Sequence, residues 1–157
     1  MPNLLFDGFD LTQIELRHRH TPDELAACFP AITELRPALK DVNEWVVRAI
    51  DMQTDGYRVL AASGKGTVLA LAGYRTMETL AHGRFVYVDD LVTLNSHRNR
   101  GLGSTLLNRL SKIGSEECCR HLIINSTAAH ARAEKFFQRK GLVEASVGFF
   151  KTLEEFK

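Results

Sequence analysis

The sequence predicts an α+β fold in which helices flank a mixed β-sheet. Three observations indicate this class: helical periodicity in some segments, apolar alternation or β-branched runs in others, and one glycine-rich turn that joins a strand to a helix. The chain has 157 residues, of which 45% are hydrophobic and 25% are charged. That length and composition are typical of one globular domain with a substantial core, so we expect a single domain over residues 1–157.

The first third of the chain predicts one strand and two helices. Residues 11–17 (LTQIELR) alternate apolar and polar side chains, as a half-buried strand does. Residues 21–24 (TPDE) have the types that begin a helix, with Thr as N-cap, Pro at the first position and acids in the first turn. We expect this helix to run to about Leu35. Asp41 or Asn43 should cap a second helix.

The middle of the chain predicts a hairpin and a long strand. The segments YRVLAA and TVLALAGYRT, joined by a turn at residues 63–66 (SGKG), are typical of a β-hairpin. Residues 84–94 (RFVYVDDLVTL) are rich in Val, Phe and Tyr and form the strongest strand signal in the chain.

The last third predicts two helices separated by a short strand. A helix is expected over residues 102–116, because the apolar residues there fall on one helical face: Leu102, Leu106, Leu107, Leu110 and Ile113. Residues 121–125 (HLIIN) are almost wholly apolar, as expected for a buried strand. A helix from about residue 128 to 140 should end at Gly141 as its C-cap, and a last strand or strands should cover residues 142–151. The predicted order is β, α, α, three strands, α, β, α, β.

Composition argues against several classes of function. The formal net charge of +1 gives no reason to expect a nucleic acid or an anionic membrane as the main partner. No apolar run approaches the ~20 residues of a transmembrane helix, and the first residues lack the basic segment of a secretory signal. Three cysteines, two of them adjacent at Cys118 and Cys119, fit neither a disulfide framework nor a zinc site. We therefore expect a cytoplasmic protein without a bound metal, and we leave a homodimer open.

The stretch HRNRGLGSTLL, residues 97–107, has the character of an anion site. Its glycines let a ligand approach the backbone, and the N–H groups of the first helical turn have no intrahelical partner. A P-loop would need Lys and then Ser or Thr after its last glycine, whereas Gly103 is followed by Ser104 and Thr105. A Rossmann fingerprint would need a third glycine where this chain has Leu106. Both nucleotide-binding patterns therefore fit poorly.

A third pattern fits. Arg98-x-x-Gly101-x-Gly103, preceded by LVTL and followed by STLLNRL, resembles the pyrophosphate loop of the GCN5-related N-acetyltransferases (GNAT). The matching positions are Leu91, Arg98, Gly101, Gly103, Leu106 and Leu107, whereas Thr93, Asn95 and Asn99 replace the usual Val, Pro and Gly. Residues 133–142 (AEKFFQRKGL) resemble a second segment of the family, and the order of strands and helices follows the family over nearly the whole chain.

The resemblance implies a mostly antiparallel mixed sheet, splayed at its central strand, that transfers an acetyl group from acetyl-CoA to an amine without a covalent enzyme intermediate. Backbone N–H groups of residues 99–104 would hold the pyrophosphate, with arginine charge nearby. Free backbone groups of residues 91–93 would pair with pantetheine and polarise the thioester carbonyl. The residues expected to bind acetyl-CoA are Leu91, Val92, Thr93, Arg98, Asn99, Arg100, Gly101, Leu102, Gly103, Ser104, Asn125 and His130.

Asp89 and Asp90 are the candidate catalytic residues, because an ammonium must lose a proton before it can attack a thioester. They precede the splayed segment, where many family members carry an acidic pair, and Asp89 matches the residue often used as base. Strand alternation predicts that the two carboxylates point to opposite faces of the sheet. The structural alternative is that both form ion pairs with helices or cap the sheet edge.

Phe137 lies where the family usually has the Tyr that protonates the departing thiolate. Either water, Tyr87 or His130 donates instead, or the CoA thiolate leaves unassisted, since a thiolate is a tolerable leaving group near neutral pH. The absent Tyr also leaves open a non-catalytic acyl-CoA-binding module. The acceptor is expected to be a small primary amine or a protein amino group, lined by the helix pair of residues 21–54 and by a turn at residues 74–83.

Overall fold

The structure is a computed structural model, and it describes residues 9–125 and 131–153. It divides into two units, residues 1–125 and residues 126–157, which are described separately below. In the part of the chain that the structure describes, no helix is both long enough and apolar enough to cross a bilayer.

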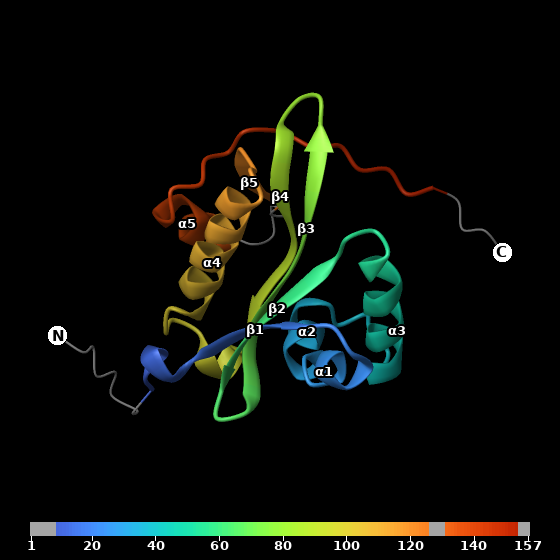
Figure 1. Cartoon of the computed structure of the whole chain (residues 1–157), viewed down its shortest axis with the longest axis vertical. Helices are drawn as coiled ribbons and strands as arrows, with labels where there is room; N and C mark the ends of the chain where they lie inside the picture. The colour runs from blue at the N-terminus through green and yellow to red at the C-terminus, as the bar shows by residue number, and fades with distance from the viewer. Residues whose placement is uncertain (1–8, 126–130, 154–157) are drawn as a thin grey trace. The chain divides into compact units, whose positions relative to one another are not determined.

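The first unit is built on a five-stranded sheet whose strands lie in the order of the sequence (Figure 1). Neighbouring strands are antiparallel, except for the last pair, which is parallel. The strands are β1 (Glu15–Arg19), β2 (Arg58–Gly64), β3 (Thr67–Thr79), β4 (Gly83–Thr93) and β5 (His121–Ile124). The α+β class and the mixed, mostly antiparallel sheet are therefore confirmed.

Helices cover both faces of this sheet (Figure 1). One face carries α1 (Pro22–Ala26), α2 (Phe29–Leu35) and α3 (Val42–Gln53), and the other carries α4 (Leu102–Glu116). Alternation along β2 divides the core between the two faces, because Val59 packs with the α1–α3 side and Leu60 packs with the α4 side. The bounds of α4 match the prediction, and all five of its predicted apolar residues are buried.

The N-terminal strand begins later than its alternating pattern predicts. Residues Leu11–Gln13 form a short 3₁₀ helix, η1, and β1 begins only at Glu15. The side chain of Asp10 accepts hydrogen bonds from the backbone N–H of Thr12, at 2.9 Å, and from its hydroxyl, at 2.7 Å. These local bonds offer the backbone an alternative to the sheet ladder, which explains the shift.

The predicted helix over residues 21–35 is two helices. Thr21 caps α1 as expected, with its side chain accepting from the N–H of Glu24, but α1 ends at Ala26 and α2 begins at Phe29. Pro30, which lacks an N–H and is tolerated only in a first turn, lies at the start of α2 and explains the break. The second predicted helix is α3, and of its two candidate caps Asp41 is the one used.

The hairpin of β3 and β4 extends further than predicted. The predicted strand ended at Thr76, whereas residues 77–79, expected only in a turn, also belong to β3 and pair with β4 as far as Thr79 opposite Gly83. They also extend past the end of β2, whose last pair is Arg58 with Tyr74. The turn itself is confined to residues 80–82.

The second unit contains α5 (Ala131–Arg139). Gly141 has a φ of +82°, and the N–H of Leu142 donates to the carbonyl of Phe137 at 3.0 Å, which confirms the predicted glycine C-cap. Residues 128–130 of the predicted helix lie outside the described residues. The last predicted strand is wrong, since residues 142–153 have no regular secondary structure and Val147 and Phe149 are exposed. An apolar alternating segment becomes a strand only when another strand satisfies its backbone groups, which local sequence cannot supply.

Candidate active site

Strands β4 and β5, the last pair of the sheet, stop pairing before β4 ends. Their parallel pairing ends at Val88 opposite Ile124, whereas β4 continues to Thr93 and remains paired with β3. Residues 89–93 therefore keep one hydrogen-bonded edge and leave the other without a partner strand in the described residues. This geometry confirms the predicted splay and places Leu91, Val92 and Thr93 along it.

Asp89 lies in a β-bulge at the start of the splay. Gly73 pairs with Asp90 and the next residue of β3, Tyr74, pairs with Val88, so Asp89 is the extra residue of β4. The prediction that the two aspartates point to opposite faces is wrong. Asp89 bonds Arg75 and Asp90 bonds Tyr57, and the Arg75 guanidinium lies 5.5 Å above the Tyr57 ring, so the bulge brings both carboxylates to the α1–α3 face.

The carboxylate of Asp90 is held at both oxygens. The hydroxyl of Tyr57 donates to Oδ2 at 2.8 Å, and Nε of Arg36 donates to Oδ1 at 2.9 Å. Arg36, which follows α2, also donates from Nη2 to the backbone carbonyl of Asp89 at 3.0 Å. The Asp90 side chain is only 12% exposed. Arg36, just after α2, and Tyr57, just before β2, thus hold the bulge in place through Asp90.

Among the described residues, the carboxylate of Asp89 bonds one other side chain, and it is more accessible than the carboxylate of Asp90. Nε of Arg75 lies 3.1 Å from Oδ2, and the Asp89 side chain is 24% exposed. Burial raises the pKa of Asp89 above its usual range, and the neighbouring charge of Asp90 adds to this, whereas Arg75 acts to lower the pKa. A carboxylate with a raised pKa is a better proton acceptor for an ammonium than an ordinary one.

Tyr87 lies on the same face, at the point where the strands part. It pairs with Arg75 on one side and with Ile123 on the other. Its hydroxyl oxygen accepts a hydrogen bond of 2.5 Å from Nδ2 of Asn125, the residue that follows β5. Burial raises the pKa of Tyr87, and the charges of Asp89 and Asp90 raise it further. Asn125, predicted as a cofactor contact, therefore lies at the splay.

The predicted anion loop connects β4 to α4. Asn99 and Gly101 have φ values of +62° and +85°, so the chain makes two left-handed steps before the helix begins. No side chain caps this end of α4, and its first backbone bond runs from Thr105 to Gly101 at 3.0 Å. The N–H groups of residues 102–104 are therefore left without intrahelical acceptors, which is the arrangement that binds anions.

The two arginines of the loop differ in their surroundings. The guanidinium of Arg100 lies 5.1 Å above the Phe9 ring, whereas Arg98 is exposed. Helix α2 also holds the start of this loop, because Oε2 of Glu34 accepts from the N–H of Asn95 at 2.8 Å. A phosphate at the helix end would therefore meet backbone donors and arginine charge together.

Two other predicted positions lie outside the described residues or in the second unit. His130 lies outside the described residues. Phe137 belongs to α5, in the second unit, where its ring lies 5.6 Å from the ring of Phe136.

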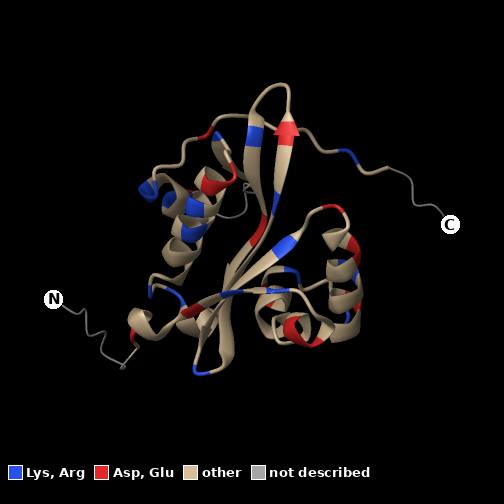
Figure 2. Ribbon diagram, in the orientation of Figure 1, with Lys and Arg blue, Asp and Glu red and all other residues tan. Residues whose placement is uncertain are grey.

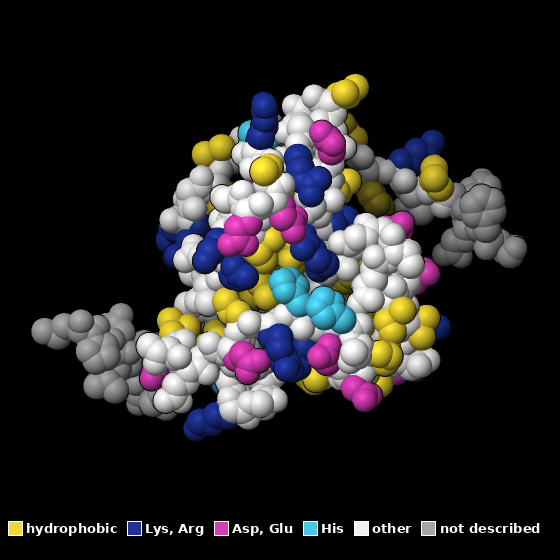
Figure 3. Space-filling view, in the orientation of Figure 1, with side chains coloured by type: hydrophobic (Ala, Val, Ile, Leu, Met, Phe, Trp, Pro, Cys, Tyr) yellow, Lys and Arg dark blue, Asp and Glu magenta, His cyan; other side chains and the backbone are white. Residues whose placement is uncertain are grey.

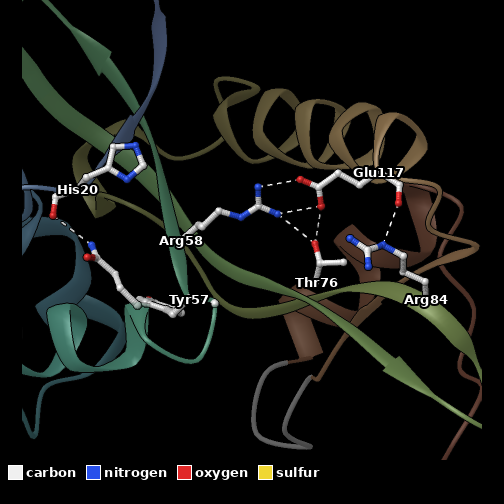
Figure 4. A pocket seen from close by; sticks show the side chains of 8 residues that line it. His20, Tyr57, Arg58, Thr76, Arg84 and Glu117 are labelled. Carbon is white, nitrogen blue, oxygen red and sulfur yellow. Dashed lines mark hydrogen bonds and ion pairs between the residues drawn. The ribbon is translucent and has the colours of Figure 1, made fainter.

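An open cleft of about 640 Å³ lies on the other side of β3. Because neighbouring residues of a strand point to opposite faces, Thr76 faces this cleft while Arg75 faces Asp89. In Figure 4, Arg58 reaches across to Glu117, with both terminal nitrogens on its carboxylate at 2.8 and 3.0 Å, and Arg84 donates to the Glu117 carbonyl. These groups bond one another, so the network joins the end of α4 to the sheet.

His20 lines this cleft, and His18 lies next to it in the same strand region. The rings of His18 and His20 stack at 5.9 Å, and a histidine pair is visible near the centre of the face in Figure 3, with basic and acidic side chains around it. Nε2 of His18 lies 2.7 Å from the hydroxyl of Tyr74. Charges of both signs occur on α3 and on α4 (Figure 2), in keeping with the small net charge of the chain.

Sequence analysis did not identify three residues of the site: Arg36, Tyr57 and Arg75. They are separated from the aspartates by as many as 54 residues, and none stands in a motif. The one local signal is Gly73, an isolated glycine within a strand pattern, which often marks a bulge or a close approach. The residue that approaches Gly73 could not be identified without the strand register.

Comparisons with known proteins agree with the geometry. The sequence profile of the Acetyltransferase (GNAT) family matches residues 20–142. The uncharacterized N-acetyltransferase YhdJ of Bacillus subtilis (strain 168) is 24% identical over 128 residues, which cover 81% of this chain and 89% of that protein.

Solved structures share the fold. A Trypanosoma brucei acetyltransferase has a TM-score of 0.74 at 19% identity, over 89% of this chain and 99% of its own. The aminoglycoside N-acetyltransferase AAC(6')-Iy, solved with CoA, has a TM-score of 0.75 at 17% identity, over 89% and 94%. The family profile covers well over half of the chain, and the splayed strand and glycine loop lie within it. The chain belongs to the acetyltransferase (GNAT) family and is an acyltransferase with acetyl-CoA as its cosubstrate.

Proposed function

We propose that this protein transfers the acetyl group of acetyl-CoA to a primary amine by direct attack, with Asp89 as the general base. The observation that carries the proposal is the β-bulge. It presents a partly exposed carboxylate with a raised pKa at the point where β4 parts from β5. A base at that point can reach an amine that approaches the splay from the α1–α3 side.

The reaction balances with the groups in place. The acceptor ammonium loses a proton to Asp89, directly or through water, and its nitrogen lone pair attacks the thioester carbonyl carbon. A C–N bond forms and the C–S bond breaks, so CoA leaves as a thiolate, and the nitrogen loses its second proton to solvent to give the neutral amide. Backbone N–H groups on the unpaired edge of residues 91–93 are proposed to polarise the carbonyl. Each such donor is worth roughly 2.7–4 kcal/mol by analogy with measured oxyanion holes.

Asp90 supports this reaction without moving protons. Both of its oxygens are engaged by Tyr57 and Arg36, and the same arginine holds the carbonyl of Asp89. We therefore assign Asp90 a positioning role and Asp89 the catalytic one.

Acetyl-CoA is proposed to bind from the glycine loop to the bulge. Its pyrophosphate would lie on the backbone N–H groups of residues 99–104, with Arg98 and Arg100 supplying charge, and its pantetheine would run along residues 91–93 towards Asn125. His130 is proposed as a further contact. Because the family profile spans residues 20–142 and so includes parts of both units, we propose that residues 1–157 function as a single acetyltransferase domain.

The acceptor is proposed to be an amine on a small molecule or a protein. Similar structures include aminoglycoside N-acetyltransferases. In this chain the two aspartates of the site are each matched by an arginine, Arg36 and Arg75, so the cluster carries no formal net charge. A test panel should therefore contain monoamines, protein N-termini and aminoglycosides in equal measure.

Release of CoA thiol with this amine panel tests the proposal. Asp89→Asn should lower turnover by roughly 10²–10⁴-fold and leave acetyl-CoA binding nearly unchanged. Glu116→Gln, which changes an exposed carboxylate at the end of α4, is the matched control and should retain full activity. Full turnover by Asp89→Asn would show that the carboxylate is structural. Acetyl-CoA binding without transfer to any amine would favour a non-catalytic acyl-CoA-binding module.

A further inference from the structure

The chain has three tyrosines, and their hydroxyls have different surroundings. The Tyr57 hydroxyl donates a hydrogen bond to Asp90. The Tyr74 hydroxyl contacts His18 on the opposite face of the sheet. The Tyr87 hydroxyl accepts from Asn125, and among the described residues nothing accepts the proton that it carries. A hydroxyl offers one donor as well as two acceptors, so Tyr87 can still donate one hydrogen bond on the face that holds Asp89.

The hydroxyl of Tyr87 lies at the closed end of the splay. The last β4–β5 pair, Val88 with Ile124, is adjacent in sequence to Tyr87 and to Asn125, whose side chain bonds the hydroxyl. The glycine loop lies at the opposite, open end, after Thr93. A pantetheine arm that is held at the loop and runs along β4 therefore brings its terminal sulfur towards Tyr87.

Tyr87 keeps its proton at neutral pH. Burial and the two aspartate charges raise its pKa above the ordinary value of 10. A thiol has an ordinary pKa of about 8.5, so complete proton transfer from this phenol to a thiolate would be uphill. A hydrogen bond from the phenol to the thiolate remains favourable, because bonds to charged groups are roughly twice as strong as neutral ones.

We propose that Tyr87 is a catalytic residue that donates a hydrogen bond to the CoA sulfur as the C–S bond breaks. This inference rests on the function proposed above. The electron pair of the broken bond stays on sulfur, the phenol shares its proton with it, and solvent supplies the proton that completes the thiol. Asp89 then returns to solvent the proton it took from the amine. Asn125 orients the phenol by donating to its oxygen.

Changing the leaving atom tests this role. The rate of acetyl transfer is measured in a single turnover for the wild type and Tyr87→Phe, first with acetyl-CoA and then with its selenoester analogue, in which selenium replaces the thioester sulfur. A selenolate is a more stable anion than a thiolate and needs less help to leave. Tyr87→Phe should slow transfer from acetyl-CoA about 10- to 150-fold, the range of one hydrogen bond to a charged group. The loss should fall to a few-fold with the selenoester, on the order of a neutral contact.

The control variant Tyr74→Phe and the wild type itself separate the possible failures. Tyr74→Phe removes a matched hydroxyl from the other face and should leave both rates unchanged. Equal losses for Tyr87→Phe with the two donors, or no loss at all, would overturn the role at sulfur, since damage to folding or to the carbonyl site does not depend on the leaving atom. Absence of transfer by the wild type would instead refute the proposed function.

Discussion

The hydroxyl of Tyr57 fills the space in which any other residue at position 73 would carry its side chain. A Cβ placed on Gly73 would overlap that hydroxyl and lie 2.6 Å from the ring carbon that bears it. Gly73 is the β3 partner of Asp90. The glycine is therefore what lets Tyr57 pass across β3 and bond the carboxylate beside the bulge.

Gly73→Ala should consequently destabilise the protein and slow acetyl transfer. Forcing a methyl group against a buried ring typically costs about 1–3 kcal/mol, and here the displaced group holds Asp90. Urea unfolding measures the loss. The same substitution in a Tyr57→Ala background should cost much less, because the two residues are in contact. Gly148→Ala, where nothing lies within 4 Å of the added Cβ, is the control. Additive effects of Gly73→Ala and Tyr57→Ala would contradict the contact.

Arg75→Gln should move the acid limb of the pH–rate profile to higher pH. Arg75 lowers the pKa of Asp89, against the raising effects of burial and of Asp90, so removing the guanidinium raises that pKa further. The base is then protonated, and inactive, up to a higher pH. The measurement is kcat against pH with a saturating amine. Arg17→Gln, which removes an exposed arginine paired with Glu15, should leave the profile in place. An acid limb that does not move in Arg75→Gln would mean that another group titrates.

Gly101→Ala should weaken acetyl-CoA binding beyond its effect on folding. Gly101 has a φ of +85°, and an L-residue there costs roughly 1–2 kcal/mol. Gly66→Ala imposes similar strain, at a φ of +79°, in the β2–β3 turn, and is the matched control. Acetyl-CoA at ~100 times its dissociation constant should stabilise the wild type by about 2.7 kcal/mol. Thermal unfolding with and without the ligand should show this gain in Gly66→Ala and a smaller one in Gly101→Ala. Equal stabilisation of Gly66→Ala and Gly101→Ala by acetyl-CoA would show that the ligand does not bind at this loop.

Folding stability should fall as the pH drops below about 6.5, in part through His18. Burial lowers the pKa of His18 from its ordinary value of 6.5, and the charges of Arg58, His20 and Arg109 act in the same direction. Between the lowered pKa and 6.5 the unfolded chain binds more protons than the folded one, so stability rises with pH in that window. Urea unfolding at pH 7.5 and 5.5 should show the loss, and His18→Gln should reduce it. His82→Gln, at an exposed position, should leave this loss of stability unchanged. If the two substitutions reduced the loss equally, the pH dependence would not come from His18.

Local sequence determined the elements whose signals are local. The apolar spacing after Gly101 sets α4, because five side chains at helical intervals must share one face. Thr21 and Asp41 mark helix starts because each satisfies an N–H within its own first turn. The glycine loop was recognisable for the same reason: its left-handed steps and uncapped helix end depend on residues close together in the chain.

Tertiary structure alone decided how the site is assembled. The alternation rule placed Asp89 and Asp90 on opposite faces, and only the register of β4 against β3 showed the extra residue that brings them together. The side-chain partners of Asp90 are Arg36, which follows α2, and Tyr57, which precedes β2, and no spacing in the sequence connects them to β4. The strand expected at residues 142–151 failed for a related reason, since a strand requires a partner and the partner is not written into its own residues. Sequence determines what a segment can form by itself, whereas contacts between distant segments decide which way a catalytic side chain points.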